Sequence, residues 1–290
     1  MIPGFADAVW TGGPVPIAYS IGGAGPPLLL LHGFPQSRAL WARIGPALAR
    51  HRTVIAPDLR GYGGSGKPAA VDAYSFRAMA ADMVGLMKGL GHDRFAIAGH
   101  DRGGRVAHRL ALDAPEAVAR LCVMDIVPTR HLLTHLTAAV ARDYYHWFFL
   151  AQPAPGPERM IGADPDAFFE SCLTGWGAAG LADFDPAQLA AYRAAWRDAD
   201  TVRGMCNDYR AALSHDAADD AADAGRAVRC PALVLWGADG AMARHYDVAA
   251  SWAPLLARMT ARALPGGHFF PDTAPGETAA ALAAFLDHEG

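Results

Sequence analysis

The stretch FAIAGHDRGGRVAHR, residues 95–109, decides the fold of this chain. Its apolar residues 95–98 predict a short buried strand, and residues 106–112 predict a helix. Gly99 and Gly103 permit a tight turn between the two, because glycine adopts backbone angles that other residues avoid. Asp101 stands at the tip of that turn. A reactive side chain on a sharp strand-to-helix turn is a known catalytic device, so Asp101 is the first candidate for a functional residue.

Outward from this stretch, apolar runs alternate with helical spacings along most of the chain. Strands are predicted at 15–20, 28–31, 53–56, 121–124, 232–236 and 262–264, and helices at 37–50, 75–90 and 277–287. Strands that alternate with helices through short connections predict an α/β fold, a mostly parallel sheet with helices on both faces. Ligands of such folds bind at the carboxyl ends of the strands.

The pattern changes near residue 128, where helices rich in aromatic residues replace the alternation. The acidic stretch 215–223 is expected to be a solvated return linker or helix end. We therefore predict a core domain in two parts, 1–127 and 226–290, with a helical lid inserted at 128–225.

The composition excludes several classes of protein. The net charge of the 290 residues is −4 and no basic stripe indicates nucleic acid. No apolar run reaches the roughly eighteen residues of a membrane span, and residues 1–10 lack the pattern of a signal peptide. The four cysteines are scattered without a CxxC, which favours free thiols in a cytoplasmic protein. No cofactor and no metal are expected.

Three polar positions follow one another in the order of the α/β-hydrolase catalytic triad: a nucleophile, an acid and a histidine. Asp101 occupies the nucleophile position, where a serine is usual, and His268 lies in a GGHF motif near the C-terminus. The acid is either Asp125, which ends the strand after the turn, or Asp239 in WGADG. The alternative role of Asp101 is a helix N-cap, which aspartate commonly fills. That role would not require the glycines around the turn or the GGHF motif near the C-terminus.

A second glycine-containing motif, HGFP at 32–35, supplies the other side of the expected oxyanion hole. The backbone N–H groups of Phe34 and Arg102 are predicted to point at a developing oxyanion.

The chain resembles the haloacetate dehalogenases of the α/β-hydrolase fold, a group that includes the fluoroacetate dehalogenases. The resemblance covers nearly the whole chain and rests on HGFPQS, DLRGYGGSGKP, GHDRGGR, MDIVPT, HWFFLAQP, DYRA and GGHF. It implies that Asp125 is the triad acid and that His146, Trp147 and Tyr209 form the halide pocket. Members of this group tend to form homodimers, so a homodimer is expected here. Trp176 is a candidate for the lining of the lid entrance.

An aspartate nucleophile changes the reaction that the triad performs. A carboxylate is ionised at neutral pH and needs no base before it attacks. It suits displacement at a saturated carbon, which gives an alkyl ester of Asp101 that water activated by His268 can hydrolyse. The sequence therefore predicts halide displacement or epoxide opening rather than ordinary ester hydrolysis.

The substrate end of the site is predicted from Arg102 and Arg105. Their spacing places both on one face at the start of a helix, where the helix N-terminus adds positive potential. Two guanidinium groups suit a carboxylate, which they can bind through paired hydrogen bonds; surface ion pairs are the alternative. The leading hypothesis is the hydrolysis of a short 2-haloacid such as haloacetate to glycolate and halide.

Two other functions stay open at this point. An epoxide hydrolase shares the aspartate nucleophile and uses two lid tyrosines, for which Tyr145, Tyr192 and Tyr209 are available. The paired arginines argue against a neutral epoxide. The third alternative is a ligand-binding protein of this fold without turnover. The sequence leaves the preferred halogen and the length of the acid undetermined.

Overall fold

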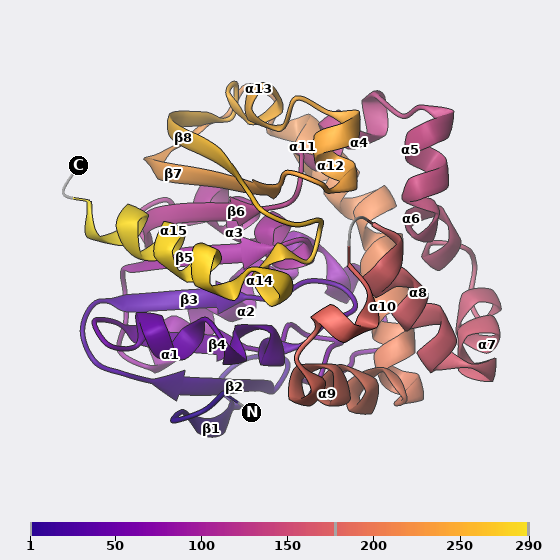
Figure 1. Ribbon diagram of the computed structural model, residues 1–290, viewed down its shortest axis with the longest axis horizontal. Coiled ribbons are helices and arrows are strands. Elements are labelled where there is room, and N and C mark those ends of the chain that lie inside the picture. Colours follow the sequence, from indigo (N-terminus) through magenta and orange to yellow (C-terminus); the bar gives the residue numbers. More distant parts are fainter. Residues whose placement is uncertain (1, 177–178, 289–290) are drawn as a thin grey trace.

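One eight-stranded sheet organises the structure, a computed structural model that describes residues 2–176 and 179–288. The order across the sheet is β1-β2-β4-β3-β5-β6-β7-β8 (Figure 1). Strands β3 to β8 run parallel, whereas β1 pairs antiparallel with β2 and β2 pairs antiparallel with β4. The strands are β1 Ala6–Trp10, β2 Ile17–Gly22, β3 Pro27–Leu31, β4 Thr53–Pro57, β5 Phe95–His100, β6 Val118–Met124, β7 Val228–Gly237 and β8 Leu256–Leu264. The predicted α/β fold is confirmed.

Both faces of the sheet are buried, which explains the continuous apolar runs of its central strands. Leu29 and Leu31 belong to one core cluster, and Leu28 and Leu30 belong to the other, because successive side chains of a strand point to opposite faces. In Figure 1, α1 and α15 lie in front of the sheet and α2 and α3 lie behind it. These four helices are α1 Gly45–Leu48, α2 Phe76–Gly89, α3 Arg102–Asp113 and α15 Pro275–Asp287.

The described chain between β6 and β7 is helical and contains no strand. Helices α6, α8, α9 and α10 lie beside the sheet rather than over one of its faces (Figure 1). The elements are α4 Thr129–Thr134, α5 Ala138–Asp143, α6 Tyr145–Leu150, α7 Gly156–Ala163, α8 Pro165–Gly175, η3 Leu181–Asp183, α9 Pro186–Trp196, α10 Ala199–Ala211, η4 Ala212–Asp216 and α11 Ala217–Ala222. In the part of the chain that the structure describes, every helix is too short or too polar to span a membrane.

The single helix predicted over 37–50 is wrong. That segment forms the short 3-10 helix η1 (Arg38–Ala42) and then α1. Pro46 lies in the first turn of α1. Since proline has no N–H to donate, it can begin a helix but cannot continue one from η1.

The expectation that 215–223 is solvated is wrong at Asp216. This residue ends the π-helical turn η4 and is 2% exposed. Its Oδ1 accepts a hydrogen bond of 2.7 Å from the backbone N–H of Phe76, at the start of α2. The acidic stretch therefore contains a buried cap for a core helix.

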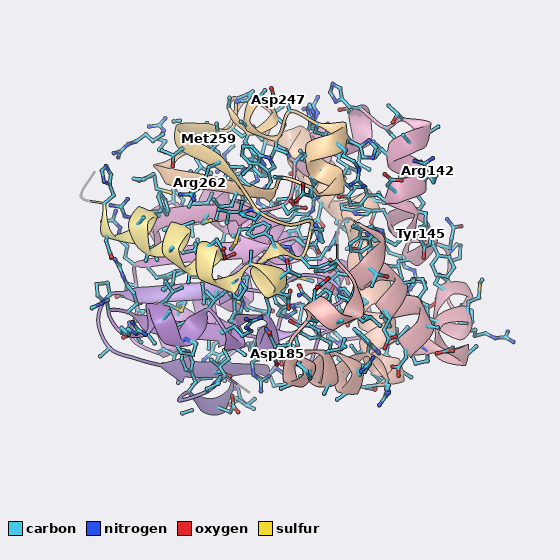
Figure 2. The ribbon with its side chains drawn as sticks, in the orientation of Figure 1. Arg142, Tyr145, Asp185, Asp247, Met259 and Arg262 are labelled. Carbon is cyan, nitrogen blue, oxygen red and sulfur yellow. The ribbon has the colours of Figure 1, made fainter. Side chains whose placement is uncertain are left out.

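The other connections complete the shell around the sheet. They are η2 Asp72–Tyr74, α12 Ala241–His245, α13 Val248–Trp252 and α14 Phe270–Thr273. Charged side chains such as Arg142, Asp185, Asp247 and Arg262 lie on the outer surface in Figure 2.

Candidate active site

Asp101 stands on a strained turn between β5 and α3. Its φ is 49° and its ψ is −116°, in a region that residues with a side chain rarely adopt. A Cβ on Gly103 would lie 2.4 Å from the carbonyl oxygen of His32, so only glycine allows this close approach. Such strain persists only where the surrounding structure enforces it, and it is common at functional positions.

The loop after β3 closes over the Asp101 carboxylate. The backbone N–H of Phe34 donates a hydrogen bond of 2.9 Å to Asp101 Oδ1. A Cβ on Gly33 would lie 2.5 Å from the Asp101 Cβ, which explains the glycine at this position. Arg102 begins α3, so its backbone N–H is one of those that lack a partner within the helix. Of the two predicted oxyanion donors, the Phe34 N–H therefore contacts the Asp101 carboxylate, and the Arg102 N–H belongs to the next residue along the chain.

His268 lies between two carboxylates. Its Nδ1–H donates to Asp125 Oδ2 at 2.6 Å, and its Nε2 lies 3.9 Å from Asp101 Oδ2. Asp125 Oδ1 accepts a hydrogen bond of 2.8 Å from the backbone N–H of Gly237, which fixes the carboxylate at the carboxyl ends of β6 and β7. Asp239 is exposed and its Oδ2 accepts from the backbone N–H of Gly266 instead. Of the two candidate acids, His268 contacts Asp125.

The charges of this group favour an ionised nucleophile. Burial alone would raise the pKa of the Asp101 carboxyl. Nearby groups lower this pKa by more than burial raises it, so the net pKa is below the ordinary value. These groups are His268, His100, Arg102 and the Phe34 N–H. Burial lowers the pKa of His268, but the hydrogen bond and charge of Asp125 outweigh it, so the net pKa is raised.

Arg102 and Arg105 both lie beside Asp101 on α3, and both are buried. Arg102 is not free on all sides, because its Nε donates to Asp208 Oδ2 at 2.9 Å. Arg105 donates from Nη1 to Thr129 Oγ1 at 2.8 Å. The guanidinium carbon of Arg105 lies 4.8 Å from the centroid of the Trp147 ring. The alternative that these two arginines form ion pairs on the surface is therefore wrong, because both are buried.

The helical segment brings His146, Trp147 and Tyr209 together as a cluster. The Trp147 and Tyr209 rings are 5.3 Å apart, and those of His146 and Tyr209 are 5.5 Å apart. His146 Nδ1 and the Tyr209 hydroxyl are buried and have no hydrogen-bond partner in residues 2–176 and 179–288. Burial is the main reason that the pKa of His146 is well below, and that of Tyr209 well above, the usual value. Both side chains are thus neutral donors at pH 7.

Trp176 joins this cluster to the triad. Its ring lies 4.1 Å from His146 and 5.2 Å from His268, measured between ring centroids. It is 3% exposed, so it lines the interior between core and helical segment. Among the described residues, no cluster of three or more His, Cys, Asp or Glu side chains could hold a metal ion.

Comparison with known proteins identifies the family. A family model described as the alpha/beta hydrolase fold matches residues 26–275. The chain belongs to the α/β-hydrolase family. It is 52% identical over 289 residues to a fluoroacetate dehalogenase from Burkholderia sp, which covers 99% of this chain and 95% of that protein. The predicted resemblance to haloacetate dehalogenases is confirmed.

This α/β hydrolase is also similar to a second sequence relative and to a solved structure. A soluble epoxide hydrolase from Corynebacterium sp. (strain C12) is 32% identical over 89% of this chain and 88% of that protein. A crystal structure of a candidate α/β hydrolase from Nostoc sp PCC 7120 matches with a TM-score of 0.97 and 43% identity, over 99% of this chain and 100% of that one.

Sequence reasoning missed two polar residues of this hydrolase site, Asp208 and Tyr144. Asp208 binds Arg102, and only its position beside Tyr209 in the DYRA motif could have indicated it. The Tyr144 hydroxyl is buried without a partner in the described chain, and its ring stacks on Trp176 at 6.0 Å. The aromatic run 144–149 contained this residue but gave no sign of which ring would face inward.

Proposed function

We propose that the protein hydrolyses short 2-haloacids, with haloacetate and water giving glycolate and halide. The observation that carries this proposal is the carboxylate of Asp101 on the nucleophile turn, next to two buried arginines. In the first step an Asp101 oxygen attacks the carbon that bears the halogen. The carbon–halogen bond breaks with its electron pair, and an ester of Asp101 and a halide ion result.

His268 then regenerates the nucleophile. Its Nε2 takes a proton from a water molecule, and the resulting hydroxide attacks the carbonyl carbon of the Asp101 ester. Asp125 orients the imidazole and stabilises its charged form, for which the 2.6 Å contact provides the geometry. The N–H groups of Phe34 and Arg102 stabilise the oxyanion that forms. The bond between the Asp101 carbonyl carbon and the glycolate oxygen breaks, that oxygen takes the proton from His268, and the regenerated Asp101 carboxyl loses its own proton to solvent as glycolate leaves.

The two ends of the substrate have different partners in this proposal. Arg102 and Arg105 bind the carboxylate next to the carbon under attack. His146, Trp147 and Tyr209 donate hydrogen bonds to the departing halide, and the unpartnered Nδ1 and hydroxyl groups of two of them support this role. A strong acceptor such as fluoride would benefit most from these donors.

An epoxide hydrolase is the second candidate. The unpartnered hydroxyls of Tyr144 and Tyr209 favour it, since such enzymes use two tyrosines to protonate the oxirane oxygen. Two of the tyrosines named from the sequence do not fit. Tyr145 is 45% exposed on the outer side of the helical segment (Figure 2), and the Tyr192 hydroxyl donates to Asp272. The buried arginines favour an anionic substrate over a neutral epoxide.

The domain division and assembly belong to the same proposal. The helices of 128–225 act as a lid over the core formed by 1–127 and 226–290, and Trp176 lines the passage between them. We expect a cytoplasmic homodimer. Light scattering after gel filtration tests the dimer directly. A monomeric mass would refute the dimer but not the activity.

The deciding experiment measures halide release by the purified protein. Fluoroacetate, chloroacetate and 2-chloropropionate are compared with styrene oxide, with Asp101→Asn as the control. Halide release that depends on Asp101 supports the dehalogenase. Diol formation from styrene oxide without halide release favours the epoxide hydrolase. Binding of haloacids without either product indicates the ligand-binding alternative.

A further inference from the structure

Asp208 of α10 holds one edge of the Arg102 guanidinium. Arg102 Nε donates to Asp208 Oδ2 and Nη2 donates to the Asp208 carbonyl oxygen, each at 2.9 Å, and Nη2 also binds Oδ1. Both side chains are 0% exposed. The remaining nitrogen, Nη1, is buried and has no partner in the described chain. Arg102 therefore offers one nitrogen to a ligand, and its charge is balanced before any ligand arrives.

The Asp208 carboxylate is itself fixed from a third part of the chain. The Tyr62 hydroxyl, in the loop after β4, donates to Asp208 Oδ2 at 2.7 Å. The Tyr209 and Phe76 rings lie 4.3 and 4.6 Å from the guanidinium carbon of Arg102. An ion pair so enclosed has a single geometry, and removal of one partner leaves a buried charge uncompensated.

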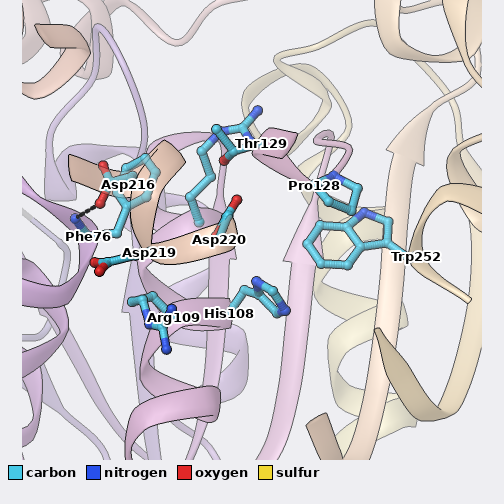
Figure 3. A pocket seen from close by; sticks show the side chains of 10 residues that line it. Phe76, His108, Arg109, Pro128, Thr129, Asp216, Asp219, Asp220 and Trp252 are labelled. Atoms are coloured by element: carbon cyan, nitrogen blue, oxygen red, sulfur yellow. Dashed lines mark hydrogen bonds between the residues drawn. The ribbon is translucent and has the colours of Figure 1, made fainter. Parts of the chain in front are cut away.

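Arg105 differs from Arg102, because no acidic side chain in the described ranges forms an ion pair with it. Its Nη1 donates only to neutral acceptors, the Val127 carbonyl at 3.1 Å and the Thr129 hydroxyl. Arg105 lines a cavity of about 10 Å³. Asp216 and Asp220 line the same cavity (Figure 3). Burial raises the pKa of Asp216 to about 8, which favours the neutral form of this carboxyl, and burial also raises the pKa of Asp220.

We propose that Asp208 is a specificity-determining residue that limits this anion receptor to one carboxylate. The inference rests on the proposed function, in which Arg102 and Arg105 bind the substrate carboxylate. Asp208 cancels one of the two arginine charges, and Asp101 offsets the other. A monocarboxylate adds one negative charge to the buried group, whereas a dicarboxylate adds two. A second unpaired charge in a buried site is costly, so dicarboxylates are rejected.

Two probes that do not react test this selection: malonate, and malonamate, which has the same size but one charge fewer. Calorimetry with the whole wild-type protein should give malonamate an affinity at least on the order of tenfold higher than malonate. Asp208→Asn should reduce this ratio to about unity, because Arg102 then becomes available to the second carboxylate. An unchanged ratio in the folded variant overturns the proposal. Equal binding of both probes to the wild type does so without any variant, and acetate binding without either larger probe would assign the selection to size.

The matched control is the same substitution in another buried pair. Asp82 accepts from Arg60 Nε at 2.6 Å and is 1% exposed. Asp82→Asn should lower the thermal stability as Asp208→Asn does, and leave the malonamate-to-malonate ratio unchanged. A ratio that falls equally in both variants indicates general loosening and contradicts a specific role for Asp208.

A rescue experiment separates charge from structure. Arg105→Gln should weaken acetate binding, and the addition of Asp208→Asn should restore part of it, since the charge of Arg102 is then released. A double variant that binds acetate no better than Arg105→Gln overturns the proposal. These affinities need no turnover, so they are distinct from wild-type halide release, which tests the proposed function.

Discussion

Replacement of His268 by Asn should stop the reaction after its first half. His268 Nε2 lies 3.9 Å from Asp101 Oδ2, too far for a direct hydrogen bond, so the histidine is not paired with the nucleophile before the ester forms. The attack by Asp101 needs no base, because the carboxylate is already ionised. We therefore expect His268→Asn to release one halide ion for each Asp101 and then to stall.

The size of the effect follows from the role of the lost group. General-base catalysis by a positioned side chain contributes about 10²- to 10⁴-fold, so steady-state turnover should fall by that factor while the first turnover persists. The buried contact with Asp125 can be kept in part, because the Asn amide is also a donor. The fold should therefore survive the substitution.

Two measurements on the same sample check this prediction. A rapid-mixing halide assay with chloroacetate should show a burst equal to the enzyme concentration. Intact mass spectrometry should show an increase by one carboxymethyl group, located on Asp101 after digestion. Asp101→Asn is the control and should show neither burst nor adduct. Full turnover by His268→Asn without a covalent adduct would refute the two-step scheme.

The remaining predictions concern pH and single side chains. Because the pKa of His268 is raised by Asp125 against the effect of burial, steady-state turnover should fall as the pH drops through that raised value, while the halide burst persists; a burst that disappears in parallel contradicts this assignment. Burial lowers the pKa of Arg105 to about 10, so KM for haloacids should rise as the pH passes 10, where the charge is lost. Tyr209→Phe should slow fluoroacetate turnover by roughly tenfold or more, and chloroacetate turnover less, because fluoride is the stronger acceptor; equal losses would remove Tyr209 from the halide site.

The sequence predicted the sheet and the nucleophile turn because both depend on local signals. Continuous apolar runs indicated the buried strands, and Gly99 and Gly103 indicated a turn that only small residues permit. The edge strand β1 was not predicted, since its residues are mostly exposed and show no inward-facing pattern. The false helix over 37–50 arose from apolar spacing that continued across Pro46.

Contacts between distant positions were harder to predict. The sequence left Asp125 and Asp239 both open, and the preference for Asp125 came from the resemblance. The contact itself joins residues 143 positions apart, between the loops that follow β6 and β8, two strands that β7 separates in the sheet. The Arg102–Asp208 pair spans 106 positions and joins the core to a helix for which periodicity gives no orientation. Both depend on the packing of whole elements.

The position of α10 relative to α3 links the two ends of the site. Asp208 and Tyr209 are consecutive, so their side chains point roughly 100° apart around the helix axis. The Asp208 carboxylate binds Arg102 on α3, and the Tyr209 ring lies against both the Arg102 guanidinium and Phe34, 5.2 Å from the latter between ring centroids. A shift of α10 would therefore move Arg102 and the proposed halide donor Tyr209 together. Selection for the acid group and for the halogen cannot then be altered independently by changes that displace this helix.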